Sequence, residues 1–318
     1  MRLRLIPLLF VLCLGFSFGN IAKAISVGPG IVDVAVDAGK QTDFDFVVTN
    51  EEFQTLTFAL TIQKFLPQGD SGQVKFLSAD DTTGLPDWLF LEQPTLTLRA
   101  GESKKISVSF RVPSDATPGG HYAAIFLTQT SLDTEAGQNV SAIPRIGVLV
   151  FATVNGNVQE RLGGPVVTVD PTMTSHLPVR FNVELENLGN IHVLPTVQID
   201  ITNVLGQTVA TLDGNELRGR VMPGSNRVLT SEWRKNASEE DSGFWYELQQ
   251  EWRNGGIGWY KANVRVSSRV GEAGTTSVSF QVWPWRSLII GFVMLVTLFL
   301  GFSSMRRSRP RLYRRPLV

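Results

Sequence analysis

Histidines, nucleophilic serines and glycine loops are the first places to look for catalysis, because they supply bases, nucleophiles and phosphate cradles. The chain has three histidines, His121, His176 and His192, in three separate turn or strand regions. It contains no H-E-x-x-H, no G-x-S-x-G and no phosphate-binding glycine loop. These patterns predict no catalytic residue, no cofactor and no enzymatic activity. A hydrolase or enzyme subunit built from distant loops stays open as an alternative, and it would need a deep pocket with convergent polar groups.

Four aspartates between residues 33 and 46 are the strongest candidates for a metal site: Asp33, Asp37, Asp43 and Asp45. A calcium loop of the EF-hand type takes carboxylates from positions 1, 3 and 5 of one short loop. The spacing of these four fits solvent-facing strand positions and a turn instead. The sequence therefore predicts no metal site.

The segment GFWYELQQEWRNGGIGWYKA (243–262) concentrates six aromatic residues and three of the chain's seven tryptophans. Such side chains form core, ligand platforms or contacts with a membrane interface. The spacing after Ser242 predicts a short helix. One side of this helix would carry Trp245, Leu248, Gln249 and Trp252.

Residues 1–24 have the pattern of a signal peptide. Arg2 and Arg4 give a positive start, an apolar run follows, and Ala22-Lys23-Ala24 offers a small-x-small cleavage pattern. Cys13 is the one cysteine and lies inside the apolar run, so the mature chain would carry no disulfide.

The other end has the pattern of a membrane anchor. Residues 287–305 carry no charge, and a helix of that length would rise about 28 Å, enough to span the hydrocarbon. Trp283 and Trp285 flank its start, as interfacial aromatics do. Residues 306–318 are basic and would lie in the cytoplasm, so the chain is expected in the plasma membrane, single-pass, with its N-terminus and ectodomain outside. The residues that set this orientation are Arg306, Arg307 and Arg309.

The formal net charge of +0 hides an asymmetry. Ten basic residues and no acidic ones lie in the leader and from Arg286 onward, which leaves 19 basic against 29 acidic residues in the ectodomain. A net charge near −10 argues against nucleic acid as a partner.

Between the two ends, apolar and polar residues alternate with a period of two, which is typical of strands. DFDFVVTN (43–50), LTFALTI (56–62) and KISVSFRV (105–112) are examples, separated by turn-forming residues. The expected fold class is all-β: two tandem immunoglobulin-like antiparallel β-sandwiches plus one C-terminal transmembrane helix.

An internal repeat also indicates two domains. The boundary is expected near residues 155–165, with domain 1 over 25–158 and domain 2 over 159–284. The repeated pairs are 43–50 with 180–187, 100–110 with 223–233, and 119–127 with 256–264.

The last of these pairs sets Tyr122 against Tyr260 at the start of strand F. In immunoglobulin-like sandwiches a tyrosine at this corner hydrogen-bonds back to nearby backbone. Both are therefore expected to be structural tyrosines rather than catalytic phenols.

The order of leader, two sandwiches, one span and a basic tail resembles the bacterial WxL-interacting protein family. The resemblance implies a peptidoglycan-binding domain, then a host-binding domain and a membrane anchor, with peptidoglycan or another wall polymer and exported surface proteins as partners. The aromatic segment and the short arginine-rich tail depart from the family, and no glycan-contact residue can be carried over. The segments that carry the resemblance are VGPGIVDVAVDAGKQTDFDFVVTN (27–50), LTLRAGESKKISVSFRVP (96–113), GGHYAAIFL (119–127), SAIPRIGVLVFATVNG (141–156), PVRFNVELENLGNIHVLPTVQIDI (178–201) and PWRSLIIGFVMLV (284–296).

These features lead us to expect an envelope protein that noncovalently binds wall polymer, exported proteins or both, as an adhesion or scaffold component. The alternative is a chaperone-like module that lends a strand to a secreted subunit or accepts one. That alternative requires an exposed, pairing-competent edge strand, and a charged or bulged edge would weigh against it.

The aromatic segment falls between strands E and F of domain 2, at the end where strand G (about 275–283) leads into the span. We expect it to face the membrane and to contact lipid headgroups. The other possibility is that it caps the lower core of the domain. The candidate interface residues are Phe244, Trp245, Tyr246, Trp252, Trp283 and Trp285.

Overall fold

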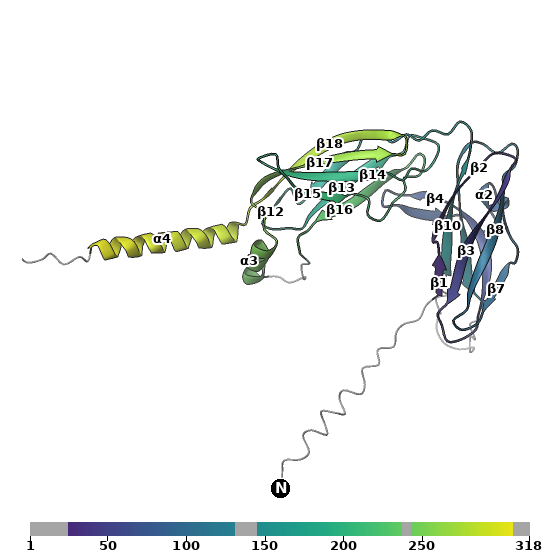
Figure 1. Ribbon diagram of the computed structural model, residues 1–318, viewed down its shortest axis with the longest axis horizontal. Coiled ribbons are helices and arrows are strands. Elements are labelled where there is room, and N and C mark those ends of the chain that lie inside the picture. The colour runs from purple at the N-terminus through teal and green to yellow at the C-terminus, as the bar shows by residue number, and fades with distance from the viewer. Residues whose placement is uncertain (1–24, 131–144, 237–242, 308–318) are drawn as a thin grey trace, which may run out of the picture. The chain divides into compact units, whose positions relative to one another are not determined.

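The computed structural model describes residues 25–130, 145–236 and 243–307 (Figure 1). The expected signal peptide and Arg309 lie outside these residues. The chain divides into two compact units, one made of residues up to Leu66 plus Phe76–Gly156 and the other of Pro67–Lys75 plus the chain from Asn157 onward. The sequence placed the boundary at 158/159.

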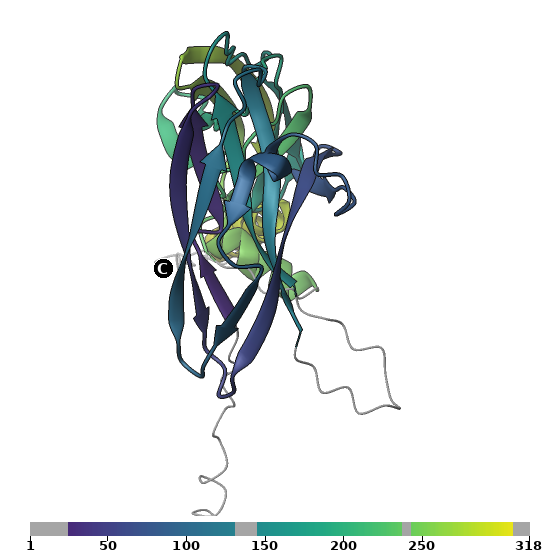
Figure 2. The same cartoon turned by 90° about the vertical axis from the view of Figure 1, so that its right-hand side faces the viewer.

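The first unit is a sandwich of two sheets, and Figure 2 turns it toward the viewer. A short helix, α2, connects two of its strands. One sheet has the order β1 (Ile25–Gly28), β3 (Gln41–Asn50), β8 (Ser103–Arg111), β6 (Leu89–Leu91). The other has the order β2 (Ile31–Val36), β10 (Arg145–Val154), β9 (Gly119–Gln129), β4 (Leu56–Gln68), β5 (Gln73–Phe76), with β7 (Thr95–Leu98) also paired to β4; α2 covers Leu85–Trp88.

The second unit is a smaller sandwich with one helix, α3, between two of its strands and a second helix, α4, after its last strand. Its first sheet has the order β11 (Val166–Asp170), β13 (Val179–Glu186), β16 (Asn226–Trp233). Its second has the order β12 (Met173–Thr174), β18 (Gly271–Val282), β17 (Gly258–Ser268), β14 (Thr196–Asn203), β15 (Thr208–Asp213); the helices are α3 (Phe244–Arg253) and α4 (Trp285–Arg307).

Alternating apolar residues place a separate core between the sheets of each unit. Phe46, Val48 and Phe110 are buried in the first unit, and Phe181 and Val183 in the second. The pleat sends successive side chains to opposite faces, so the period-two pattern becomes one apolar face per sheet. The expected all-β class with two sandwiches and one C-terminal apolar helix is confirmed.

Each unit also contains a parallel strand pair, which the sequence did not predict. β2 pairs with β10 in parallel, and β12 pairs with β18 in parallel. The cause is a change of sheet by the first strand of each unit. In the first unit β1 pairs with β3, the chain crosses at Pro29 and Gly30, and β2 then continues in the opposite sheet beside β10.

The two units share a buried asparagine at equivalent positions of the repeat: Asn50 at the end of β3 and Asn187 just after β13. Asn50 donates its side-chain amide to the carbonyls of Gln54, Leu98 and Arg99 at 2.8 to 3.1 Å. Asn187 donates in the same way to the carbonyls of Ile191 and Val221. In both units this side chain satisfies backbone groups of the turn that follows and of the incoming strand.

Candidate functional site

The outer edge of β10 is only partly covered by β2. The Leu149 N–H donates to the Gly30 carbonyl at 2.9 Å, and β2 pairs with β10 from Leu149 to Val154. Within the described residues no strand pairs with this edge from Arg145 to Val148. The open stretch is short, and it lies where β10 emerges from the segment that connects it to β9.

The backbone groups of this stretch alternate in direction. The Leu149 N–H points outward to β2, so the N–H and carbonyl groups of Arg145 and Gly147 point outward too, because the period along a strand is two. Ile146 and Val148 bond inward to β9, opposite Leu127 and Ile125. The N–H and carbonyl groups of Arg145 and Gly147 therefore give two donors and two acceptors with which another strand could pair.

The surroundings of this edge are apolar. Ile146 and Val148 turn their side chains to the interior of the sandwich, and Ile25 and Val27 of β1 belong to the same cluster. β1 lies beside β10 but pairs with β3 in the other sheet. An added strand would place its inward side chains among aliphatic neighbours.

On the outer face of β10, the Phe126 ring leaves no room for a side chain at Gly147. A Cβ built there would lie 2.9 Å from a ring carbon of Phe126. The guanidinium carbon of Arg145 lies 3.5 Å from the centroid of the same ring, and Phe76 packs edge-on against it at 4.8 Å. The Phe126 ring therefore packs over Gly147 of β10, between Arg145 and Phe76.

The uncovered edge of β8 carries charges that discourage pairing, and β18 has an uncovered edge as well. β6 pairs with β8 only from Val108 to Phe110, and the uncovered part of β8 carries Lys104 and Lys105. In the second unit β12 covers only Gln281 and Val282 of β18, but β17 and β18 shift register at Val266/Ser267. The shift lies opposite Glu272–Gly274, whereas Thr275–Phe280 of β18 stay in register with β17, carry no charge and have no partner strand on their outer side among the described residues. The open part of β10 has one charge and no register shift.

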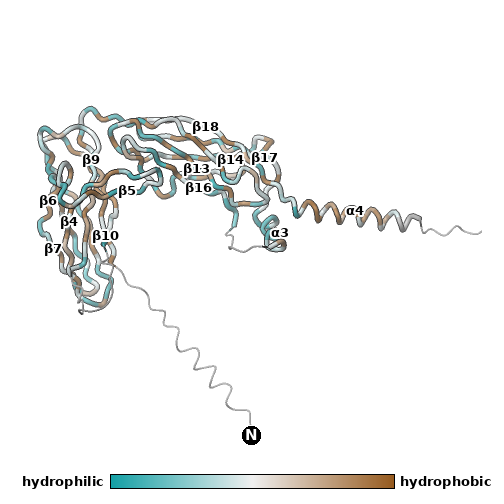
Figure 3. The backbone as a smooth tube through the Cα atoms, turned by 180° about the vertical axis from the view of Figure 1, so that it is seen from behind, coloured by the Kyte–Doolittle hydropathy of each residue, from teal (hydrophilic) through white to brown (hydrophobic). Residues whose placement is uncertain are grey.

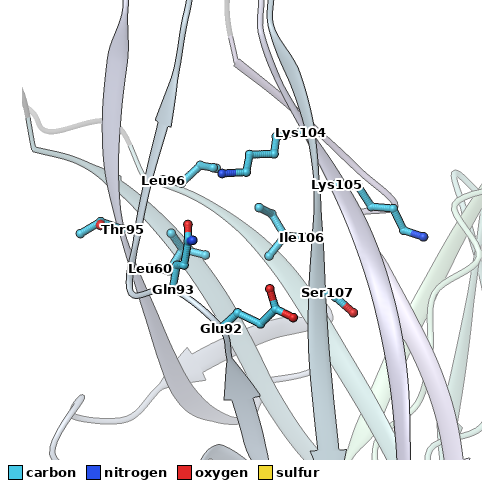
Figure 4. Close-up of a pocket in the computed structure, with 9 residues that line it drawn as sticks. All are labelled: Leu60, Glu92, Gln93, Thr95, Leu96, Lys104, Lys105, Ile106 and Ser107. Carbon is cyan, nitrogen blue, oxygen red and sulfur yellow. The ribbon is translucent and has the colours of Figure 1, made fainter.

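A pocket in the first unit lies where the chain crosses from β6 to β7 (Figure 4). It combines the Glu92 carboxylate and the Lys104 ammonium with an apolar floor, whereas the Lys105 side chain points away and its ammonium lies 2.8 Å from Asp45; none of the three histidines lines the pocket. The lining residues are Leu60, Glu92, Gln93, Thr95, Leu96, Lys104, Lys105, Ile106 and Ser107.

The histidines lie apart from one another in the fold. The His121 ring packs at a tilt against Trp88 in the first unit, with ring centroids 4.6 Å apart, and His176 hydrogen-bonds to Glu247 at 3.1 Å in the second. Among the described residues no group of three or more His, Cys, Asp or Glu side chains could hold a metal ion.

α4 is long and apolar enough to cross a membrane. Its window Trp285–Ser303 has a mean hydropathy of 2.0, and none of it is buried (brown in Figure 3). The backbone of α4 extends through Arg306 to Arg307, two of the expected positive-inside residues.

α3 is joined to the start of α4 by a buried carboxylate. Glu251 accepts hydrogen bonds from the Ser287 N–H at 2.8 Å, the Ser287 hydroxyl at 2.7 Å and the Arg286 N–H at 3.2 Å. Burial acts to raise the pKa of Glu251, but these hydrogen bonds outweigh it and lower the pKa below its ordinary value. Arg286 also lies 3.3 Å from Glu247.

The expected interface aromatics divide into two groups. Phe244, Trp245, Trp252 and Trp285 are exposed, whereas Tyr246 and Trp283 are half-buried. Trp283 donates to Gln281 and packs edge-on against Trp259. Three of the exposed side chains, Phe244, Trp245 and Trp252, belong to the segment 243–262, and their exposure contradicts the alternative that they cap the lower core.

Tyr122 and Tyr260 lie on different faces of their sheets. The Tyr260 hydroxyl accepts a hydrogen bond from the Ile257 N–H at 3.1 Å, and its ring packs on Phe280 toward the core. Tyr122 packs against Phe65 and Phe151 on the outer face of its sheet. The pairing of these two tyrosines in the repeat is therefore one residue out of register.

No protein-family model matches the chain, and no curated protein matches it. Several solved structures are similar to it. They include the class 5 fimbriae chaperone CfaA (10% identity, TM-score 0.40, 81% of this chain and 99% of that chain) and the E. coli chaperone DraB (12%, 0.35, 82% and 96%). A chain from the Salmonella enterica SafA pilin–SafB chaperone complex is also similar (13%, 0.36, 83% and 99%). Identities this low show the fold alone.

These neighbours correct the expected main function. The sequence led us to expect an adhesion or scaffold protein that binds wall polymer, exported proteins or both, whereas several of the similar structures are of fimbrial chaperones. The sequence also offered the alternative of a chaperone-like module. The open stretch of β10 is the kind of edge strand that this alternative requires.

Proposed function

We propose that this chain is a membrane-anchored, chaperone-like module that pairs the open edge of β10 with an extended segment of an exported protein. The single observation that carries the proposal is that no strand within residues 25–130, 145–236 and 243–307 pairs with the outward backbone groups of the stretch from Arg145 to Val148. Strand addition of this kind takes its affinity from main-chain hydrogen bonds and its specificity from alternate side chains.

The chemistry of the edge defines the partner. Ile146, Val148, Ile25 and Val27 line the interior beside it, so the incoming segment needs apolar residues at every second position. An extended apolar segment with unpaired backbone groups is a template for aggregation, and pairing it with an edge strand removes that template.

α4 holds this module at a bilayer. The basic residues after the span support an orientation with the two sandwiches outside the cytoplasm, where exported proteins pass. Membership of the WxL-interacting family stays a prediction from sequence resemblance.

The first step of the test is capture. A photo-crosslinking amino acid replaces Arg145 in the full-length chain in its native host, and mass spectrometry identifies the segment that it captures. The same amino acid at Lys105, on the charged edge of β8, is the matched control. We expect capture at position 145 of a segment with alternating apolar residues. Equal capture at position 105 would speak against a specific edge.

The second step compares two substitutions at one residue. Arg145→Ala keeps the outward N–H, whereas Arg145→Pro removes it and leaves the hydrogen bonds to β9 intact. Loss of one hydrogen bond corresponds to roughly a three- to tenfold weaker binding of the captured segment. We expect Arg145→Pro to bind more weakly than Arg145→Ala by that factor, and equal affinities would refute backbone pairing at this edge.

A further inference from the structure

α3 is an amphipathic helix with its polar side buried and its aromatic side exposed. Gln250 and Glu251 are each 4% exposed, whereas Phe244, Trp245 and Trp252 are 49%, 76% and 75% exposed. Helices of soluble domains bury the apolar side instead. Exposed clusters of large apolar side chains mark surfaces that meet a partner or a membrane.

Hydrogen bonds hold the helix in this orientation. Glu251 is anchored to Ser287, and the Asn254 side chain, just after the helix, donates to Gln250 at 2.6 Å. The Asn254 carbonyl accepts from the Leu177 N–H at 2.9 Å. Rolling α3 to bury its tryptophans would break these bonds and expose a carboxylate that has no solvent contact now.

The aromatic side is continuous with the start of the span. The Trp252 indole N–H donates to the Ser287 hydroxyl at 3.0 Å, so its ring lies level with the first residue of the uncharged stretch. Trp245 is seven residues earlier and shares the same side of the helix. Trp285 is exposed beside them, with the Arg286 guanidinium 4.4 Å from its ring centroid. Figure 1 shows α3 next to the end of α4 that begins at Trp285.

The charges on this surface favour lipid over an acidic or basic protein surface. On α3 the one fully charged exposed side chain is Arg253, since Glu251 is buried and Glu247 is half-buried against His176 and Arg286. Tryptophan is the side chain that settles best at the headgroup level, because its ring is apolar and its N–H is polar.

We propose that α3 lies in the membrane interface and inserts Phe244, Trp245 and Trp252 into the headgroup and upper acyl region of the bilayer that α4 spans. The Glu251–Ser287 contact makes α3 and the start of α4 one rigid element. The second unit thereby contacts the bilayer through two elements, α4 and α3. These two contacts fix the orientation of the unit relative to the bilayer.

Bromolipid quenching of tryptophan fluorescence tests this in the full-length chain, with one chain per nanodisc and lipids brominated near the headgroup end of the acyl chains. The test variant is Trp245→Phe with Trp252→Phe, which keeps aromatic rings on the helix. The control is Trp88→Phe with Trp233→Phe, which removes one half-buried and one core tryptophan. Circular dichroism verifies that both fold.

The quenched fraction of the tryptophan emission should change in opposite directions in the two variants. The quenched fraction of the emission should fall in the test variant, because the lipid-exposed indoles are gone, and rise in the control. An unchanged or increased fraction in the test variant would overturn the proposal. Loss of the fall when each disc holds two chains would also overturn it, because a second copy would then cover α3 in place of lipid.

Discussion

Ser287 donates both its backbone N–H and its hydroxyl to one carboxylate oxygen of Glu251, at 2.8 and 2.7 Å. The first turn of any helix leaves N–H groups without partners inside the helix, and a carboxylate at that end also interacts well with the helix dipole. Here the carboxylate comes from another helix. The Glu251 carboxylate thus accepts hydrogen bonds from N–H groups in the first turn of α4 and holds α3 against that turn.

Glu251→Gln should loosen this junction. An amide keeps the size of the side chain but loses the charge that strengthens its hydrogen bonds, which are worth about 1.5–3 kcal/mol each when one partner is charged. Hydrogen–deuterium exchange of the peptide that contains Ser287 should become faster in the full-length chain. The exposed Gln249→Ala on the same helix is the control and should leave the exchange rate unchanged.

Low pH should weaken the contact between Glu251 and Ser287 over a defined pH range. The folded pKa of Glu251 is lowered, so its contribution to stability is complete above the ordinary glutamate pKa of about 4.3 and is lost as pH falls through the folded pKa. The melting temperature of the wild type should approach that of Glu251→Gln below that range. A constant difference between the two from pH 7 to pH 3 would contradict the assignment.

The two buried asparagines should have similar importance in their own units. Asn50→Ala leaves the Leu98 and Arg99 carbonyls without the amide donor, and Asn187→Ala does the same to the Ile191 and Val221 carbonyls. Each substitution should lower the free energy of unfolding of its unit by roughly 2–4 kcal/mol. Denaturant unfolding measures this, with the exposed Asn226→Ala as the control. A loss equal to that control would contradict the role given to these amides.

Gly147 should tolerate no side chain. Its Cβ would lie 2.9 Å from the Phe126 ring, so Gly147→Ala must displace that ring and should cost about 1–3 kcal/mol in the first unit. Gly30→Ala, at the sheet crossing, meets nothing within 4 Å and should be nearly neutral. Thermal unfolding compares the two, and equal melting temperatures would show that the ring moves freely.

The sequence predicted what depends on local pattern. Alternating residues predicted both sandwiches, and the uncharged stretch predicted α4, because periodicity and length follow directly from strand and helix geometry. The repeat paired Asn50 with Asn187. Their shared hydrogen bonds could have been inferred from this, since a strand-end asparagine before a turn is a plausible donor to backbone.

The candidate sites depend on contacts between distant segments. The orientation of α3 follows from Glu251 meeting Ser287, 36 residues later, so helical spacing alone could place Trp245 and Trp252 together but could not show which side is buried. The open edge of β10 follows from where β2 begins to pair with it, after the crossing at Gly30. Tyr122 differs from Tyr260 because the two are not equivalent positions: the ungapped pairing of 119–127 with 256–264 aligns Tyr122 with the exposed Trp259 and aligns Tyr260 with Ala123, on the core side.

Amide hydrogen exchange at Gly147 tests the central claim most directly. The Val148 N–H bonds to β9 and should exchange slowly in the free chain, whereas the Gly147 N–H points outward from the open edge and should exchange fast. Adding the captured segment at saturation should slow exchange at Gly147 and leave Val148 unchanged. If Gly147 still exchanges at its free rate while the segment is bound, the segment does not pair with β10, and the chaperone-like function proposed for this edge is wrong.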